Sequence, residues 1–154
     1  MRDSIRELIV QNDICVLATA SDNVPHTSLM AYLPSDDARE IYLLTSRSTR
    51  KYANCLRNPS VSLLLDTRET HRADQRAAAK ALTLYGECAP SASAESRETL
   101  KARFAARFPH LAGLAAHPDS EVLVVRLRAA QLLSGVQDSH YETFAADKAA
   151  GQED

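Results

Sequence analysis

The sequence lacks the features that mark membrane-spanning, secreted and nucleic-acid-binding proteins. No window approaches the roughly 20 apolar residues that span a bilayer, and residues 1–4 lead into a mixed-charge segment rather than the apolar core of a signal peptide. With 18 Lys and Arg against 20 Asp and Glu, the net charge of −2 provides no basic field that would hold nucleic acid by its phosphates. These absences predict a cytoplasmic protein with no membrane and no nucleic-acid partner. At 154 residues the chain is most simply one domain.

Cysteine and histidine are scarce and dispersed along the chain. Cys15, Cys55 and Cys88 are odd in number and lack the C-x-x-C spacing of zinc and redox sites, so we expect small buried or half-buried thiols. The histidines lie in different segments without the i, i+4 pair of a metal-binding helix, and no metal site is predicted. They are His26, His71, His110, His117 and His140.

What the sequence does contain is a series of short apolar and β-branched runs separated by polar turns, which predicts a mainly β chain. Strands are expected over residues 14–20, 25–33, 40–45, 61–65, 81–89 and 121–128, with 131–133 as the seventh. The run at 61–65 is almost unbroken, so both of its faces are expected to be covered. Gly86 is expected to mark a bulge or a bend in its strand.

Helices are expected near residues 4–12, 48–56 and 94–108, the last with a stripe of Leu100, Phe104 and Phe108. Residues 66–80 read as an exposed, partly helical connection, and residues 138–154 as a polar, loosely held tail. The simplest fold for strands in this order is a small antiparallel barrel with helices at its ends.

The most informative stretch follows the third strand. Thr45 and Ser46 end that strand, and Arg50 and Lys51 open the next helix. A helix start presents unpaired N–H groups and the positive end of the helix dipole, so hydroxyls and cations gathered there make a seat for a phosphate. Solvated cations at a helix start are the alternative interpretation of the same residues.

This stretch resembles the pyridoxamine 5'-phosphate oxidase-like family of split-barrel flavoproteins. The resemblance covers Ile14 to Ala89 and rests on the Thr45-Ser46 and Arg50-Lys51 pairs and on Asn58-Pro59 before the next strand. It implies an α+β, mainly β fold: a six- to seven-stranded antiparallel split β-barrel with flanking helices, over residues 1–137. It also implies an FMN cofactor held at a homodimer interface.

The resemblance further implies roles for individual residues. The FMN phosphate would be bound by Thr45, Ser46, Arg50 and Lys51, and the backbone of the second strand would lie along the flavin ring. That part of the strand comprises Ser28, Leu29 and Met30.

The chain also departs from the family's oxidase. Ser28 stands where the oxidase has an arginine, Ala81 or a neighbour replaces a glutamine that reaches the flavin, and the C-terminal substrate clamp has no counterpart near residues 127–137. The sequence therefore predicts an FMN-dependent oxidoreductase for an unidentified small substrate rather than the vitamin enzyme. A non-catalytic flavin-binding module, or a split barrel that uses haem or a deazaflavin, are the alternatives.

Overall fold

A computed structural model describes residues 1–68 and 73–145 of the chain. The strands within these residues are β1 (Ile14–Ser21), β2 (Val24–Pro34), β3 (Glu40–Ser46), β4 (Ser60–Asp66), β5 (Lys80–Pro90), β6 (Ser120–Ser134) and β7 (Asp138–Thr143). The helices are α1 (Asp3–Gln11), α2 (Arg50–Arg57), α3 (Ala94–Arg107) and α4 (Ala112–Ala116), with 3-10 turns η2 (Ala73–Ala78) and η3 (Pro109–Leu111).

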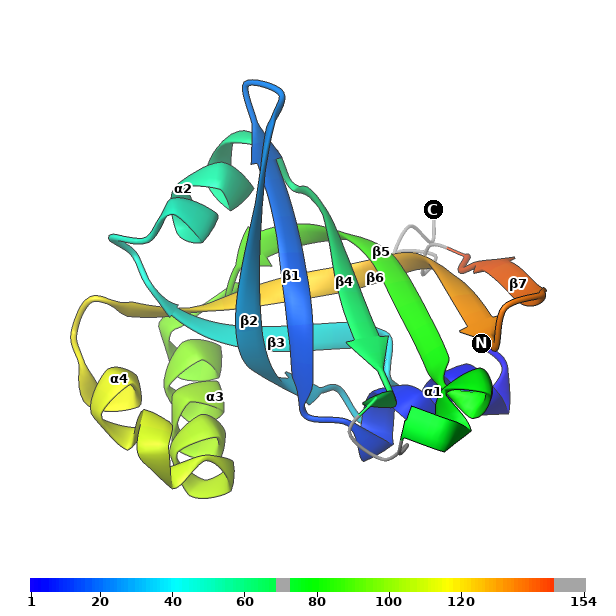
Figure 1. The fold of residues 1–154 in the computed structure, drawn as a ribbon. Coiled ribbons are helices and arrows are strands. Elements are labelled where there is room, and N and C mark those ends of the chain that lie inside the picture. Colours follow the sequence, from blue (N-terminus) through cyan, green and yellow to red (C-terminus); the bar gives the residue numbers. More distant parts are fainter. Residues whose placement is uncertain (69–72, 146–154) are drawn as a thin grey trace, which may run out of the picture.

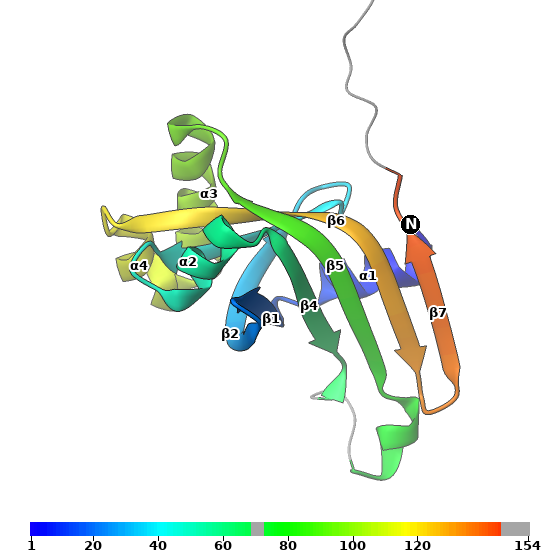
Figure 2. The same cartoon turned by 90° about the horizontal axis from the view of Figure 1, so that it is seen from above.

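The strands form one antiparallel sheet that closes on itself (Figure 1). Its order is β3-β2-β1-β4-β5-β6-β7, and an additional β3–β6 pairing closes the first six strands into a barrel. Figure 2 shows α2, α3 and α4 gathered on one side of this barrel, with α1 and β7 on the other. The predicted mainly β, antiparallel barrel with flanking helices is confirmed.

Strand β6 pairs with β5 along one edge and divides its other edge between β3 and β7. Residues 120–126 of β6 pair with β3, whereas residues 129–134 pair with β7. At the junction Tyr85 pairs with Ala129 but Gly86 pairs with Leu127, which leaves Arg128 as the extra residue of a bulge. A Cβ on Gly86 would lie 2.5 Å from the Arg126 carbonyl oxygen, so only glycine allows this approach. The bulge predicted at Gly86 is confirmed.

Two apolar clusters hold the fold together. The larger fills the barrel, where Tyr32 is almost completely buried and donates a hydrogen bond from its hydroxyl to the Ile9 carbonyl of α1 at 2.6 Å. The smaller lies outside the barrel, where the predicted stripe on α3 packs against Leu44 and Val122 of β3 and β6. Burying a side chain such as Phe104 stabilises the fold by about 2–3 kcal/mol. The second cluster therefore fixes α3 beside β3.

Several local expectations are corrected by the fold. Leu64 in the middle of β4 is 37% exposed, so the prediction that both faces of this strand are covered is wrong for the single chain. Strand β7 occupies residues that were expected to belong to the polar tail, because its backbone pairs with the second half of β6. The remainder of the predicted tail, residues 146–154, lies outside the described residues. None of the helices that the structure describes is long and apolar enough to cross a membrane.

Candidate functional site

A corner lined with hydroxyl groups connects β3 to α2. Thr49 is the N-cap of α2, where its Oγ1 accepts a hydrogen bond from the Tyr52 amide at 3.4 Å. The same hydroxyl donates to the Ser46 carbonyl at 2.9 Å and lies 3.0 Å from Thr45 Oγ1. The helix therefore begins at Arg50, slightly later than predicted. These bonds place two threonine hydroxyls next to the positive end of α2.

A cavity of about 570 Å³ opens beside this corner. Five of the predicted site residues line it, namely Leu29, Met30, Thr45, Ser46 and Lys51. The other lining residues are Asp13, Ile14, Ala31, Leu44, Thr49, Phe108, His110, Leu111 and Leu114. Hydroxyl groups and one ammonium group therefore share the cavity with a largely apolar set of side chains.

Two predicted site residues, Ser28 and Arg50, do not line the cavity. The Ser28 hydroxyl lies 3.3 Å from Nε2 of His26, its neighbour along the strand. Arg50 is exposed to solvent at the first position of α2. Of the two adjacent cations predicted to bind an anion, the structure thus brings only Lys51 to the cavity.

Lys51 is also free to meet a ligand. No ion pair involves it among the residues that the structure describes. The acidic residue of the cavity, Asp13, is paired instead with Arg107, whose Nη2 lies 2.7 Å from Asp13 Oδ2. The positive charge at the corner is therefore not cancelled by a carboxylate that shares the cavity.

The opposite wall comes from the segment after α3, which the sequence did not connect with the corner. Phe108 ends α3, and Leu111 and Leu114 follow in η3 and α4, packed against the outer apolar cluster. The His110 ring stands edge-on to Phe108, with ring centroids 6.1 Å apart. The α3 stripe signals a buried helix in the sequence, but no local pattern places its end opposite Lys51.

A buried carboxylate lies behind the corner. The side chain of Glu121 is 4% exposed and accepts hydrogen bonds from Arg47 Nη2 at 3.0 Å and Ser91 Oγ at 2.9 Å. Arg97 Nη1 lies 3.5 Å away, and the Val122 amide also donates to this carboxylate. Burial raises the pKa of Glu121, but these donors and charges more than offset it, so its pKa lies below the ordinary value. Glu121 is therefore ionised at neutral pH.

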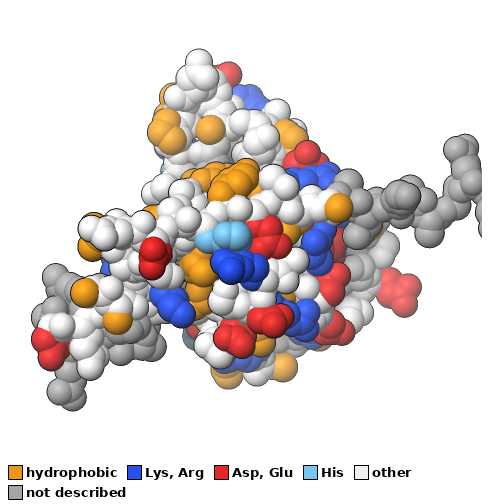
Figure 3. Space-filling view, turned by 90° about the vertical axis from the view of Figure 1, so that its right-hand side faces the viewer, with side chains coloured by type: hydrophobic (Ala, Val, Ile, Leu, Met, Phe, Trp, Pro, Cys, Tyr) orange, Lys and Arg blue, Asp and Glu red, His pale blue; other side chains and the backbone are white. Residues whose placement is uncertain are grey.

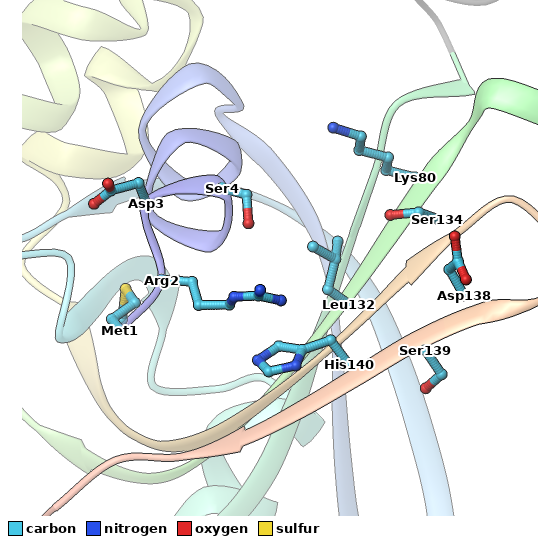
Figure 4. Close-up of a pocket in the computed structure, with 10 residues that line it drawn as sticks. All are labelled: Met1, Arg2, Asp3, Ser4, Lys80, Leu132, Ser134, Asp138, Ser139 and His140. Carbon is cyan, nitrogen blue, oxygen red and sulfur yellow. The ribbon is translucent and has the colours of Figure 1, made fainter.

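A larger cavity, of about 890 Å³, is lined by residues from the side of the barrel that carries α1 and β7 (Figures 2 and 4). It is lined by residues of the N-terminal segment, the ends of β5 and β6, and β7. Figure 3 shows acidic and basic side chains interspersed over the face of the molecule on which the N-terminus lies. Arg2 and Lys80 share this cavity with Asp3 and Asp138, and no predicted site residue lines it. This cavity is the larger of the two, but its cations share it with acidic side chains, whereas the smaller cavity combines Lys51 and hydroxyl groups with a largely apolar lining.

The three cysteines are free and buried, as predicted. Burial raises the pKa of the Cys15 thiol to about 12. The neighbouring Cys88 thiol holds the pKa of Cys55 below its ordinary value, and Cys55 in turn raises the pKa of Cys88. No group of His, Cys, Asp and Glu side chains within the described residues is arranged to hold a metal ion.

Comparisons with known proteins agree with this architecture. The family model described as pyridoxamine 5'-phosphate oxidase matches residues 1–134. A putative pyridoxamine 5'-phosphate oxidase from Listeria innocua shares 16% identity at a TM-score of 0.68, over 85% of this chain and 96% of that one. No curated protein sequence matches the chain.

Haem proteins have the same fold. The haem storage protein HutZ from Vibrio cholerae is 22% identical at a TM-score of 0.68, over 88% of this chain and 96% of its own. A haem-binding protein from Mycobacterium smegmatis is 17% identical at a TM-score of 0.77, and the match spans 93% of this chain but 59% of that protein. At these identities the likeness shows a shared fold and does not select between cofactors.

Proposed function

The chain belongs to the pyridoxamine 5'-phosphate oxidase family, and from this premise we propose that it binds FMN in the cavity beside α2 as a flavin-dependent oxidoreductase for a small substrate. The observation that carries the proposal is Lys51, an unpaired ammonium group among hydroxyls at one part of an otherwise largely apolar cavity. FMN is likewise charged at one end, where it carries a phosphate dianion, and largely apolar at the other, where it carries a planar ring.

The donor set fits the phosphate. Lys51 supplies opposing charge, and the hydroxyls of Thr45, Ser46 and Thr49 lie beside the start of α2, where each can rotate its proton from its present partner to the phosphate. Arg50 lies next to Lys51 in the chain and adds positive potential from outside the cavity. These groups bind and orient the cofactor by its charged end.

The remainder of the cavity fits the flavin ring. Leu29 and Met30 line it from β2, and Phe108, Leu111 and Leu114 line it from the segment after α3. When bound, the flavin supplies the electron-transfer chemistry, whereas these residues exclude water and position the ring. The departures at Ser28 and Ala81 and near residues 127–137 support a substrate other than pyridoxamine phosphate.

The test is the visible spectrum of the purified full-length protein, followed by FMN titration monitored by flavin fluorescence. The wild-type protein is expected to show flavin absorbance and to bind FMN, and the double variant Arg50→Ala/Lys51→Ala is expected to lose FMN. Arg57→Ala is the matched control, because Arg57 is an exposed cation at the other end of α2. A colourless protein that does not take up added FMN would contradict the proposal.

Haem is the second candidate, and His110 is the observation that favours it. His110 lines the cavity, and an imidazole nitrogen beside an apolar surface is what an iron porphyrin requires. Haem binding would give a Soret band that depends on His110, and His117→Ala serves as a control because His117 does not line this cavity. A deazaflavin would be detected by competition with FMN. A flavin module without catalysis would take up FMN but show no turnover with NAD(P)H and an electron acceptor.

A homodimer is part of the proposal. Val16 of β1 pairs with Leu29 of β2 and with Leu64 of β4, so the three form one row across neighbouring strands. Leu29 is 75% exposed and Leu64 is 37% exposed, and Ile14 at the start of β1 is also exposed. Ile14 and Leu29 line the cavity, so a second copy placed on this row would also close the cavity.

A further inference from the structure

The buried carboxylate of Glu121 lines no part of the cavity, but it contacts the turn of the hydroxyl corner and the helix α3, which leads to the lining residue Phe108. Glu121 pairs with Thr45 across the β3–β6 ladder, and Arg47 reaches it from the turn directly after Thr45. Arg97 reaches it from α3, and Ser91 from the connection that leads into α3. One side chain therefore joins the hydroxyl corner to the helix that ends at Phe108.

The arrangement is a fully satisfied buried ion. The carboxylate accepts hydrogen bonds from the Arg47 guanidinium at 3.0 Å, the Ser91 hydroxyl at 2.9 Å and the Val122 amide. The Arg97 guanidinium lies 3.5 Å away. Removing the carboxylate leaves two guanidinium groups next to each other without their common partner, and breaking such a node is costly. A rigid node is also what keeps two walls of a site at a constant spacing.

Arg47 also fixes the backbone of the corner. Its amide donates to the Asp119 carbonyl at 2.9 Å, so both the backbone and the side chain of Arg47 are tied to the β6 end. The turn at residues 46–49 is thereby held by Asp119 and Glu121, neither of which lines the cavity. Its guanidinium is committed to Glu121, while Lys51 remains free for the ligand.

We propose that Glu121 is the positioning residue of the site: through Arg47 and Arg97 it sets the spacing between the hydroxyl corner and the α3 wall, and so couples α3 to ligand binding at the corner. This inference deepens the proposed function and rests on it for the identity of the ligand. It adds a residue that does not touch the ligand and that the family resemblance did not indicate.

The experiment is a double-mutant cycle with FMN as the probe. Arg97→Gln cuts the connection to α3 without touching the corner, and it is expected to weaken FMN binding about tenfold in the wild-type background. In the Glu121→Gln background the same substitution is expected to have little further effect, because the ion pair of Arg97 with this side chain is already lost. Equal effects of Arg97→Gln in both backgrounds would overturn the inference.

The sign of the Glu121→Gln effect separates positioning from simple electrostatics. This substitution removes a negative charge near the corner, so an electrostatic role predicts tighter FMN binding, whereas a positioning role predicts weaker binding. Riboflavin, which lacks the phosphate, is expected to lose affinity as well. Glu87→Gln is the control for the loss of a carboxylate charge, because Glu87 is an exposed residue of the neighbouring strand that pairs with Arg128 at 2.8 Å and does not line the cavity.

Amide hydrogen exchange of the ligand-free protein makes the inference independent of the cofactor. Arg97→Gln is expected to speed exchange of the amides at residues 46–52, in addition to those at the start of α3, whereas Glu87→Gln is not. If the wild-type protein fails to bind FMN but the exchange result holds, the proposed cofactor is wrong and the coupling stands. Unchanged exchange at residues 46–52 would overturn the coupling whatever the ligand.

Discussion

The two walls of the cavity differ in how they are built. The hydroxyl corner is a contiguous segment, in which Thr45, Ser46, Thr49 and Lys51 are neighbours in the chain and are fixed by local hydrogen bonds. The facing wall combines β2 with the segment from Phe108 to Leu114, which reaches its place by packing against the outside of the barrel.

In the proposed site, the two walls would recognise a ligand by different physical means. The corner offers directed donors and one charge, which would select an anionic group at a fixed position. The apolar wall offers area without direction, which accepts a planar or apolar body and tolerates variation in shape. The corner should set affinity for the cofactor, and the wall should set which second molecule fits beside it.

The largest predicted effect concerns the open side between these walls. Leu64→Glu would place a charge in the apolar row proposed to contact a second copy, and a symmetric interface would receive that charge twice. We expect sedimentation to show a monomer and FMN affinity to fall. Val136→Glu is the control, because Val136 is 96% exposed in the β6–β7 turn. A wild-type protein that is monomeric with FMN bound would contradict the dimer.

The second prediction compares the two adjacent cations of the corner. Lys51→Ala is expected to weaken FMN binding about 100-fold, since it removes a charge-assisted contact worth about 2–3 kcal/mol. Arg50→Ala is expected to cost only a few-fold, because Arg50 does not line the cavity. The measurement is the FMN dissociation constant of each variant. An effect of Arg50→Ala equal to that of Lys51→Ala would show that both cations contact the phosphate.

The third prediction concerns the dependence of stability on pH. Because the pKa of Glu121 in the folded state lies below its ordinary value of 4.5, the folded state binds this proton more weakly than the unfolded chain. The contribution of the ionised Glu121 to the stability of the fold is therefore complete above pH 4.5. It is lost as the pH falls below 4.5 and through the lowered pKa. Glu121→Gln is expected to lower the free energy of unfolding by about 2 kcal/mol at pH 7.

Urea unfolding at a series of pH values measures this effect. The difference between wild-type and Glu121→Gln should shrink as the solution is acidified below pH 4.5, because wild-type Glu121 then loses its charge. A difference that stays constant over this range would show that the carboxylate charge does not contribute.

The smallest effect is expected at the apolar wall. Leu111→Ala removes part of a half-buried side chain and should weaken FMN binding by about 1 kcal/mol, or roughly fivefold. The fluorescence of the bound flavin should change as water reaches it, and titration with FMN reports both quantities. Leu56→Ala on the exposed side of α2 is the control, since Leu56 is 56% exposed. If Leu111→Ala weakened FMN binding more than Lys51→Ala does, the apolar wall rather than the corner would set the affinity for the cofactor.

Much of the fold followed from patterns within single segments. Apolar runs between polar turns located the barrel strands, although residues 131–133, predicted as a separate seventh strand, continue β6. The stripe of Leu100, Phe104 and Phe108 located a helix that is buried where predicted. Gly86 marked the bulge because only glycine permits the backbone approach that the bulge requires. The polar strand β7 escaped prediction, since its place depends on pairing with β6 rather than on an apolar pattern.

By itself, the sequence determined the corner: residues that are close in the chain form a turn and a helix cap through local hydrogen bonds, so a phosphate seat at Thr45 to Lys51 could be predicted. The tertiary structure decided which of these groups face one cavity, bringing in Lys51 while leaving Ser28 and Arg50 outside it. It also decided that Glu121 would connect Arg47 with Arg97, and that Phe108 to Leu114 would face the corner. These contacts join residues far apart in the chain, and only the packing of the whole barrel brings such residues together.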